Sequence, residues 1–511
     1  TKTKGAKFMG ALIGIDLGTC YSAVAMLDET GRPTIIHNQD GQNITPSCVA
    51  IEGSTVLVGE VPRRIWASDQ TGAAARFKRD MGTATVHRIG EREFSPTELS
   101  AFVLQKVVKD AVAVVGSIAS AVVTIPANFA NDAREATIAA AKSAGLNIRD
   151  IVNEPTAAAL YYAFKNSQDK NGQGLDGHYA VYDLGGGTFD VSVIKVVGQN
   201  IDVIVSNGVV RLGGDDFDRA LQELAAKKFK AMTGRELGPR DYTLGNAEDD
   251  KRSLSSRREV SVDVGGQVIK LTREEFEQAI SSRIAQAEML CEATLEESSL
   301  SPSDIKAVFL AGGSTRIPSV KESIRRVFKQ EPTATANVDE VVALGAALYV
   351  AYKAPPHTLT ETQRQSIQKI QVQEVTSKCY GTISLAESDA TGMQRLENTV
   401  LILKNEKIPC SVSQTFYTAS DGQTAVLCRL TETTSAETDP QFAKVVWSGD
   451  LELPPGRPAG QPIVITYSFT PNQTMKCNFV DQASGRRTDV EISLTASSSE
   501  STDKKSRLKV E

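Results

Sequence analysis

Short apolar runs that end in an acidic residue and a glycine turn recur along the first two thirds of the chain. Residues 12–27 read LIGIDLGTCYSAVAML, and residues 181–194 read VYDLGGGTFDVSVI. Runs of β-branched and other apolar residues, broken by glycine, predict a strand, a turn and a second strand. We therefore expect two β-hairpins of the same kind, with Asp16 and Asp183 at the ends of their first strands.

Around these hairpins, strands alternate with amphipathic helices up to about residue 352. Residues 95–98, Ser-Pro-Thr-Glu, form a helix-start signal, because the Ser and Glu side chains can cap the first turn. A short strand is expected to end at Asn153, so that Glu154 and Pro155 begin a helix. Other expected helices cover 95–115, 132–144, 247–256, 272–295 and 337–352, and other expected strands cover 121–126, 201–212 and a run from 308.

The pattern changes after residue 353. Residues 354–373 contain two consecutive prolines and are then polar and rich in Gln, which indicates a linker. From 374 to 496 apolar and polar residues alternate, which is typical of antiparallel strands. Residues 497–511 are rich in Ser and charged residues and predict a disordered tail, and residues 1–9 predict a flexible start. The expected fold class is α/β followed by an antiparallel β domain.

Composition narrows the classes of function. A chain of 511 residues is too long for one core and indicates two or three domains. The net charge of −6 argues against a general nucleic-acid binder. The seven cysteines are scattered and form no CxxC pair, which suits a reducing compartment without a zinc site. No signal peptide or membrane-spanning run is recognisable, so we expect a cytoplasmic protein.

Glycine turns at the ends of two strands favour phosphate binding. Without a Cβ, backbone N–H groups can approach an anion closely, and the carboxylates of Asp16 and Asp183 suit Mg²⁺, directly or through water. A single hairpin of this kind is also compatible with an ordinary glycine-rich turn. Two such hairpins facing each other across a cleft make phosphate binding the stronger hypothesis.

Further polar residues stand at suitable positions, each with a simpler explanation beside the functional one. Glu154 lies at a strand-to-helix junction, where it could serve helix electrostatics alone. Lys78, within AARFKRDMG, is on composition alone a solvated cation. The remaining candidates are Glu248, Lys251 and Ser255, which share one helix face, then Ser314 and Arg316 after a third glycine turn, and Asp339 at the start of the last helix.

These motifs together resemble the seventy-kilodalton heat-shock chaperones of the DnaK family. The segments are GIDLGTCYS, FKRDMG, TIPANF, NEPTAAA, DLGGGTFDVS, LGGDDFD, KRSLSS and AGGSTRIP, in the family's order and at about its spacing. The resemblance is dense over residues 10–352 and looser to about 495, and the run after FKRDMG is most similar to a specialised bacterial, HscC-like branch. It implies an actin-like, two-lobed ATPase (10–353), a linker (354–373) and a β-sandwich that binds extended peptide (374–496).

The resemblance also implies roles for individual residues. Lys78 would contact the β and γ phosphates, and Glu154, Asp190 and Thr188 would position the attacking water. Asp16 and Asp183 would hold Mg²⁺ through water, and K⁺ is a further candidate ion. Pro126 and Arg134 match the family's allosteric proline switch, and Ala419 and Val426 match its peptide-cleft loop. The remaining nucleotide contacts would come from Gly18, Thr19, Cys20, Tyr21, Gly185, Gly186, Gly187, Gly213, Gly214, Glu248, Lys251, Ser255, Gly313, Ser314, Arg316 and Asp339.

Three departures from the family pattern bear on function. Cys20 stands where the family usually has Thr, which adds an oxidisable thiol. The family's leucine-rich linker is replaced by the polar SIQKIQVQEVT, which puts the coupling of ATP to peptide release in question. The family's helical lid has no counterpart, so any bound peptide is expected to exchange quickly. Apart from these departures, residues 385–399 contain an insertion, which leaves open whether the peptide cleft works or has been remodelled or lost.

Three hypotheses follow. The first is an ATP-dependent chaperone of the DnaK type with weak ATPase activity, acting on unfolded peptide with a J-domain protein and a nucleotide-exchange factor, and without nucleic acid or membrane. The second is an ATP-binding relative that acts as a regulator or structural partner without coupled peptide release. The third is a small-molecule kinase of the actin-like superfamily, which the β-sandwich sequence disfavours.

Overall fold

The computed structural model describes residues 10–167, 176–198, 200–333, 337–368, 370–386, 395–471, 473–492 and 508–511. The chain divides into two compact units, and the second comprises residues 373–496. The first unit comprises residues 1–372 and 497–511. Most of the insertion expected between 385 and 399, and residues 1–9, lie outside the described residues.

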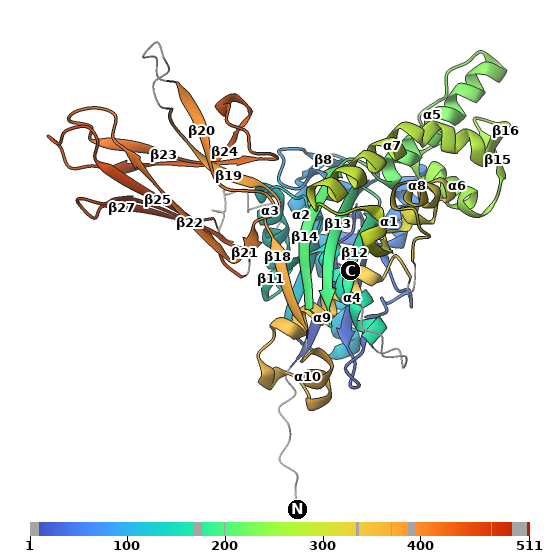
Figure 1. The fold of residues 1–511 in the computed structure, drawn as a ribbon. Helices are drawn as coiled ribbons and strands as arrows, with labels where there is room; N and C mark the ends of the chain where they lie inside the picture. Colours follow the sequence, from blue (N-terminus) through green and yellow to red (C-terminus); the bar gives the residue numbers. More distant parts are fainter. Residues whose placement is uncertain are drawn as a thin grey trace, which may run out of the picture. The chain divides into compact units, whose positions relative to one another are not determined.

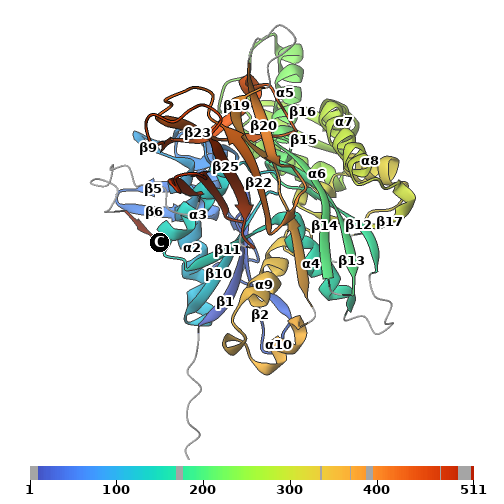
Figure 2. The same cartoon turned by 60° about the vertical axis from the view of Figure 1, so that its left-hand side comes forward.

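The first half of unit 1, residues 10–153, is built on a mixed sheet with the strand order β11-β10-β1-β2-β3, and β4 pairs with β2. β1 pairs in parallel with β10 and antiparallel with β2, as the expected hairpin requires. α2 and α3 pack together beside this sheet (Figure 2). Its strands are β1 (Ala11–Asp16), β2 (Tyr21–Leu27), β3 (Pro33–Ile36), β4 (Thr45–Pro46), β10 (Ile118–Ile125) and β11 (Ile148–Asn153).

Smaller elements complete this half. A sheet of order β28-β6-β5-β7 and a hairpin β8-β9 lie within unit 1. α2 begins with the capping box expected from Ser95 and Glu98, because each residue's side chain bonds to the other's backbone N–H. The elements are β5 (Cys48–Glu52), β6 (Thr55–Val58), α1 (Glu60–Ser68), β7 (Ala73–Ala75), η1 (Phe77–Asp80), β8 (His87–Ile89), β9 (Arg92–Phe94), α2 (Pro96–Val115), α3 (Asn131–Ser143) and β28 (Lys509–Val510).

The second half of unit 1, residues 176–333, repeats the pairing pattern of the first. Its strands run in the order β17-β12-β13-β14, with β12 parallel to β17 and antiparallel to β13. Asp183 and Asp190 are direct partners across the β12–β13 ladder. The strands are β12 (Gly177–Leu184), β13 (Thr188–Val197), β14 (Asn200–Val210), β15 (Glu259–Val264), β16 (Gln267–Thr272) and β17 (Ile305–Ala311).

Long helices cover this second sheet and enclose its core (Figure 1). The core joins the inward side chains of β12 and β13, such as Tyr182 and Phe189, to those of α5 and α7, such as Phe217 and Phe276. Burial of large apolar side chains like these is the main stabilising contribution of such an arrangement. The helices are α5 (Gly214–Thr233), α6 (Leu244–Ser256), α7 (Arg273–Glu297), η2 (Pro302–Asp304), η3 (Gly313–Arg316) and α8 (Pro318–Phe328).

Two helices, α4 (Glu154–Ser167) and α9 (Val341–Lys353), join the halves. α9 packs on β1 and β2, α4 packs on β12 and β17, and the two helices contact each other closely. Gly345 makes this crossing close, because an added Cβ would lie 1.7 Å from the carbonyl oxygen of Ala157. The expected helix from 337 starts instead at Val341, because residues 337–340 form a turn in which the Glu340 N–H donates to the Asn337 carbonyl.

Two segments of unit 1 differ from the expected linker and tail. Within 354–373 the structure has η4 (Pro356–Thr358) and the helix α10 (Glu361–Ile367). α10 is capped by Thr360, and the side-chain amide of Gln363 donates to the carbonyls of Leu27 and Asp28. The last four residues are likewise ordered, because β28 pairs in parallel with β6, while residues 493–507 of the expected tail lie outside the described residues.

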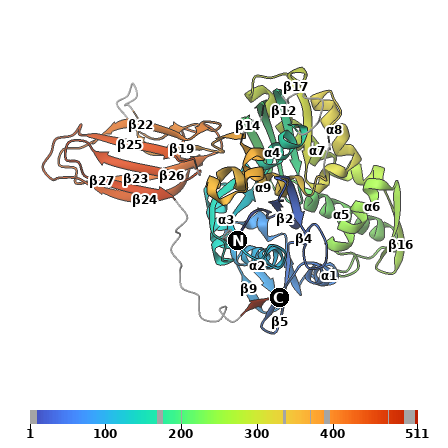
Figure 3. The same cartoon turned by 90° about the horizontal axis from the view of Figure 1, so that it is seen from below.

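Unit 2 is an antiparallel β-sandwich (Figure 3). One sheet has the order β20-β19-β23-β24 and the other β22-β25-β26-β27. Buried Tyr467 bridges them, because its hydroxyl contacts the carbonyl oxygens of Gly381 and Arg429, 3.0 and 3.1 Å away. The elements are β18 (Gln371–Val375), β19 (Cys379–Leu385), β20 (Leu396–Ile402), β21 (Lys407–Ile408), β22 (Cys410–Tyr417), β23 (Ala425–Thr433), η5 (Pro440–Phe442), β24 (Lys444–Glu452), β25 (Pro462–Phe469), β26 (Met475–Asp481) and β27 (Arg487–Ile492).

Within the ranges described above, none of the helices combines the length and the apolar character that crossing a membrane requires. All seven cysteines lie in described residues and are free thiols.

Candidate functional site

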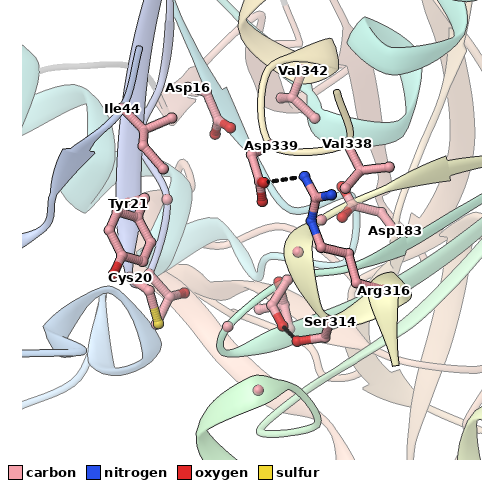
Figure 4. Close-up of a pocket in the computed structure, with 18 of the residues that line it drawn as sticks. Asp16, Cys20, Tyr21, Ile44, Asp183, Ser314, Arg316, Val338, Asp339 and Val342 are labelled. Carbon is pink, nitrogen blue, oxygen red and sulfur yellow. Dashed lines mark hydrogen bonds and ion pairs between the residues drawn. The ribbon is translucent and has the colours of Figure 1, made fainter. Parts of the chain in front are cut away.

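A cavity of about 400 Å³ in unit 1 collects most of the residues that the sequence singles out. Figure 4 shows Cys20, Tyr21 and Ile44 on one side of it and Ser314 and Arg316 on the other. The expected residues that line it are Asp16, Gly18, Thr19, Cys20, Tyr21, Lys78, Glu154, Asp183, Gly185, Gly186, Thr188, Gly214, Glu248, Lys251, Ser255, Gly313, Ser314, Arg316 and Asp339.

The turn between β1 and β2 forms one wall. Its Gly18 is required sterically, because an added Cβ would lie 1.9 Å from the carbonyl oxygen of Tyr21. Two serines hold this glycine in place. The backbone N–H of Gly18 donates to the Ser22 hydroxyl, and the hydroxyl of Ser47 donates to the Gly18 carbonyl oxygen, at 3.2 and 2.8 Å. Two hydrogen bonds therefore brace this turn where it lines the cavity.

The turn between β12 and β13 forms the facing wall. It is fastened to the start of α5, because the N–H of Gly214 donates to the Gly185 carbonyl and that of Asp215 to the Gly186 carbonyl. An added Cβ at Gly186 would lie 2.3 Å from the Sγ of Cys20. The two turns thus contact each other, and glycine at residue 186 permits that contact.

Lys78 and Glu154 meet in the cavity that the two turns line. The Nζ of Lys78 lies 2.6 Å from an oxygen of Glu154, and both residues are buried. Lys78 belongs to η1, and Glu154 is the first residue of α4, immediately after the last residue of β11. Composition alone predicts a solvated Lys78, and this prediction is wrong, because Lys78 is buried and lines the cavity.

Further carboxylates lie close enough to this ion pair to feel its charges. Burial, and next the charge of Glu154, raises the pKa of Asp16 to about 7. The same two causes, with the charge of Asp190, raise the pKa of Asp183 well above its ordinary value. A concentration of buried carboxylates near one lysine favours a bound cation, because a cation would offset their mutual repulsion.

This donor set fits Mg²⁺, which prefers oxygen ligands and usually keeps several waters. Asp16 and Asp183 lie at the ends of equivalent strands and both line the cavity. Within the described part of the chain, no three acidic, His or Cys side chains converge tightly enough to hold a metal directly. That Asp16 and Asp183 hold Mg²⁺ through water stays a prediction.

The other end of the cavity is lined by α6. The Tyr21 hydroxyl donates to an oxygen of Glu248 at 3.2 Å, and the guanidinium of Arg252 lies 4.9 Å from the centre of the Tyr21 ring. Burial alone would raise the pKa of Glu248, but Arg76, Lys251 and Arg252 hold it below its ordinary value. Glu248 is thus ionised at neutral pH and available to accept hydrogen bonds.

Residues after β17 complete this end. Arg316 lies 2.7 Å from an oxygen of Asp339, and the Ser314 hydroxyl donates to the Gly185 carbonyl at 2.9 Å (Figure 4). The lining residues that the sequence analysis did not identify are Ile44, Arg252, Gly312, Ile317, Val338 and Val342. Arg252 could have been found, because it lies one helical turn after Glu248. Nothing in the sequence marks the apolar residues of this list as part of the cavity.

The surroundings of Cys20 disfavour its thiolate form. Burial, and next the charge of Asp215, raises the pKa of its thiol well above the ordinary value. The Sγ lies 3.5 Å from an oxygen of Asp215 and donates to it. Because the thiolate is the form that oxidants attack, these surroundings lower its share, and the oxidation expected from the sequence stays a prediction.

Three residues expected in the site lie behind its walls. Asp190 is buried and pairs across the strand ladder with Asp183. Gly187 faces Thr19 and Arg79, and Gly213 faces the backbone of Gly186. None of the three lines the cavity, and their expected catalytic and nucleotide-binding roles stay predictions.

The expected allosteric and peptide-binding residues lie elsewhere. Pro126 is buried directly after β10, and Arg134 in α3 contacts the carbonyl of Phe129 and the side chain of Asn153, both at 3.3 Å. In unit 2, Ala419 is exposed between β22 and β23, while Val426 is half-buried and packs against the sandwich core. Their roles stay predictions.

A comparison with models of protein families gives an independent finding. The chain matches the family described as Hsp70 protein, in two overlapping segments that cover residues 12–89 and 83–511. Members of this family are chaperones that bind ATP, and they are generally ATPases. The match covers both units and nearly all of the chain. We conclude that the chain belongs to the Hsp70 family.

Proposed function

We propose that the cavity of unit 1 binds ATP with Mg²⁺ and hydrolyses the β–γ bond, in an actin-like domain whose two lobes are the two halves of unit 1. The observation that supports this proposal most directly is that the Lys78–Glu154 pair lines the same cavity as the two glycine turns. Phosphoryl transfer needs positioned charge and little covalent chemistry. The cavity contains those groups and no histidine.

In the proposed mechanism the two turns bind the phosphate chain. Backbone N–H groups of Gly18, Thr19 and Cys20 contact it from one side, and those of the Gly185–Thr188 turn from the other. The Lys78 ammonium stabilises the charge that develops on the transferred phosphoryl group. Glu154, assisted by the Thr188 hydroxyl, orients the attacking water. Asp190 supports this arrangement from behind the turn.

Asp16 and Asp183 would hold Mg²⁺ through water, and the bound ion would neutralise phosphate charge. The adenosine would lie at the α6 end. There Glu248, Lys251, Ser255 and Arg316 supply polar contacts. The planar guanidinium of Arg252, already stacked on an aromatic ring, offers a face for the base.

We further propose that unit 2 binds extended, unfolded peptide, and that a J-domain protein and an exchange factor act on unit 1. This rests on the family and on the sandwich fold of residues 373–496. A strand-like peptide would bind through backbone hydrogen bonds and an apolar pocket. The polar sequence of residues 366–376 favours a second candidate, in which ATP is bound and hydrolysed without coupled release of peptide.

One set of measurements separates these proposals. Calorimetry with ATP and Mg²⁺ tests nucleotide binding, and steady-state phosphate release tests hydrolysis. Adding an extended apolar peptide or a J-domain protein should accelerate release if the units are coupled. If neither addition changes the rate of hydrolysis, the result supports the candidate without coupled peptide release. If the protein does not bind ATP, both candidates are contradicted. Linkage requires a coupled protein to bind peptide with different affinity in ATP and ADP.

A further inference from the structure

Arg76 connects the two halves of unit 1 beside the nucleotide cavity. It lies between β7 and η1, in the first half, and its carboxylate partners lie on α5 and α6, in the second half. Its guanidinium pairs with Asp215, lies 2.9 Å from Asp218 and lies 3.5 Å from Glu248. We call these four residues the Arg76 clasp.

The side chains of the Arg76 clasp are buried, and the backbone of Arg76 has a conformation adapted to this position. The Arg76 side chain is 10 % exposed, and those of Asp215 and Asp218 are 1 % exposed. The guanidinium also stacks on Trp66, with its central carbon 4.1 Å from the ring centre. Arg76 has a φ of 64°, a left-handed conformation that a side chain seldom adopts. Such strain persists where surrounding contacts hold it.

Charge is segregated across this junction. Around Arg76 the first half contributes the cations, since Arg79 pairs with Asp215 and Asp216 while Arg63 pairs with Asp249 on α6. The second half contributes the carboxylates of these pairs, whereas the pairs of the exposed Arg211 and Arg240 run the opposite way. Attraction between opposite charges therefore holds α5 and α6 against the first half, and burial strengthens it relative to water.

The clasp also reaches side chains that line the cavity. Asp218 bonds to the ammonium of Lys251 at 2.6 Å, and Glu248 bonds to Tyr21 and Arg252. Arg76 itself does not line the cavity. Moving α6 away from the first turn, which would open that end of the cavity, requires Arg76 to leave its buried partners.

We propose that Arg76 is a positioning residue that keeps α6 over the bound nucleotide and makes nucleotide release slow. This inference rests on the proposed ATP site, and it adds a residue that acts through Asp218 and Glu248 rather than on the nucleotide. Breaking a buried ion pair on one side is costly, because it leaves carboxylates without their cation. Release should therefore accelerate when Arg76 loses its charge.

The test measures release of ADP directly. The full chain is loaded with a fluorescent ADP and mixed with excess unlabelled ATP in a stopped-flow instrument. We expect Arg76→Met to release ADP at least about tenfold faster than wild type. The release rate of Arg76→Lys should lie between those of wild type and Arg76→Met, because lysine keeps the positive charge but lacks the planar guanidinium that bonds two carboxylates at once. Thermal melting without nucleotide reports whether each variant folds.

Arg211→Met is the matched control. Arg211 also has positive φ, 74°, and it also pairs across the halves, at 3.2 Å from Asp80. Its side chain is 68 % exposed, so this pair should change the release rate by less than about twofold. A rate for Arg76→Met within twofold of wild type, or an equal acceleration by Arg211→Met, would overturn the proposal.

Further outcomes keep the test decisive. If Arg76→Met does not fold, Arg76→Lys decides, with an increase of about threefold or more supporting the proposal and no increase overturning it. Lower melting temperature with unchanged release would mean that Arg76 is merely structural. Wild-type protein that binds no ADP would refute the proposed ATP site, whereas normal binding with unchanged release in the variants refutes only the role of Arg76.

Discussion

The ammonium of Lys78 and a carboxylate oxygen of Glu154 lie 2.6 Å apart, although 76 residues separate them in the chain. Each side chain is less than one tenth exposed. A buried pair of this kind contributes little net stability, because desolvation offsets most of the attraction. Because the pair lies in a cavity lined by two glycine turns, a role in the reaction explains it better than a contribution to folding stability does.

Lys78→Ala should therefore abolish hydrolysis and leave nucleotide binding largely intact. We expect single-turnover hydrolysis to fall by about a hundredfold or more, with affinity for ATP within about threefold of wild type. The matched control is Lys106→Ala, which breaks another largely buried pair, with Asp110 at 2.7 Å on α2. Hydrolysis by the control should equal that of wild type, and turnover retained by Lys78→Ala would remove Lys78 from its proposed role.

Contact between the two turns predicts an interaction between Gly186 and Cys20. Gly186→Ala places a methyl group 2.3 Å from the Cys20 sulfur, so one turn must shift and nucleotide affinity should fall at least about tenfold. In the double variant Cys20→Ala with Gly186→Ala, the sulfur is gone and the nearest atom would be the Cys20 Cβ at 3.3 Å. Calorimetry should therefore find affinity largely restored.

Cys20→Ala alone is the control for that pair. Its Sγ bonds weakly to Asp215, and its proposed contact with phosphate uses the backbone, so affinity should change less than about threefold. Equal losses in Gly186→Ala and in the double variant would show that the methyl group disturbs something other than the contact with Cys20.

Local sequence signals are sufficient to predict the strands, turns and helix start that carry the site residues. The glycine turns after Asp16 and Asp183 end β1 and β12 as expected, and Glu154 begins α4 directly after a strand. Each of these features depends on a few neighbouring residues, namely an apolar run, a glycine and a cap. Such features survive folding because tertiary contacts agree with them.

Other features of the site depend on contacts between distant segments. Ile44 and Val338 line the cavity, but an apolar residue in a strand-rich sequence gives no sign of which surface it faces. The Arg76–Asp215 pair joins residues 139 positions apart, and in the sequence Arg76 is one more cation in a basic run. The helix α10 was missed because its Gln-rich composition resembles a linker, whereas the Thr360 cap and the Gln363 contacts stabilise it.

The crossing of α4 and α9 makes Gly345 a sensitive position. In an exposed helix, alanine would be more favourable than glycine by about 1 kcal/mol. Here an added Cβ would lie 1.7 Å from the Ala157 carbonyl oxygen, so the helices must separate. We expect Gly345→Ala to lower the free energy of unfolding of unit 1 by about 3 kcal/mol, measured by denaturation followed through Trp66. An unchanged midpoint would mean that the helices are not so closely packed.

Asp481 ties the end of β26 to a loop of unit 2. Arg457 pairs with it and the Ser484 hydroxyl donates to it, and these contacts, with the Arg457 bond the largest, lower the pKa of Asp481 to about 2. A carboxyl whose pKa is lower in the folded state stabilises the fold above its unfolded pKa. That stability is lost as the pH falls through the folded pKa.

Asp481→Asn should therefore lower the free energy of unfolding of unit 2 by about 2 kcal/mol at pH 7. The difference from wild type should shrink from about pH 4 downward and vanish near the folded pKa of about 2. Trp447, which stacks on Phe479 in the sandwich core, reports unfolding of unit 2 in a Trp66→Phe background. Asp489→Asn is the control, because its pair with Arg487 is exposed and should contribute less than about 0.5 kcal/mol. A difference between wild type and Asp481→Asn that persists unchanged at pH 2 would mean that packing, rather than the charge of Asp481, stabilises this loop.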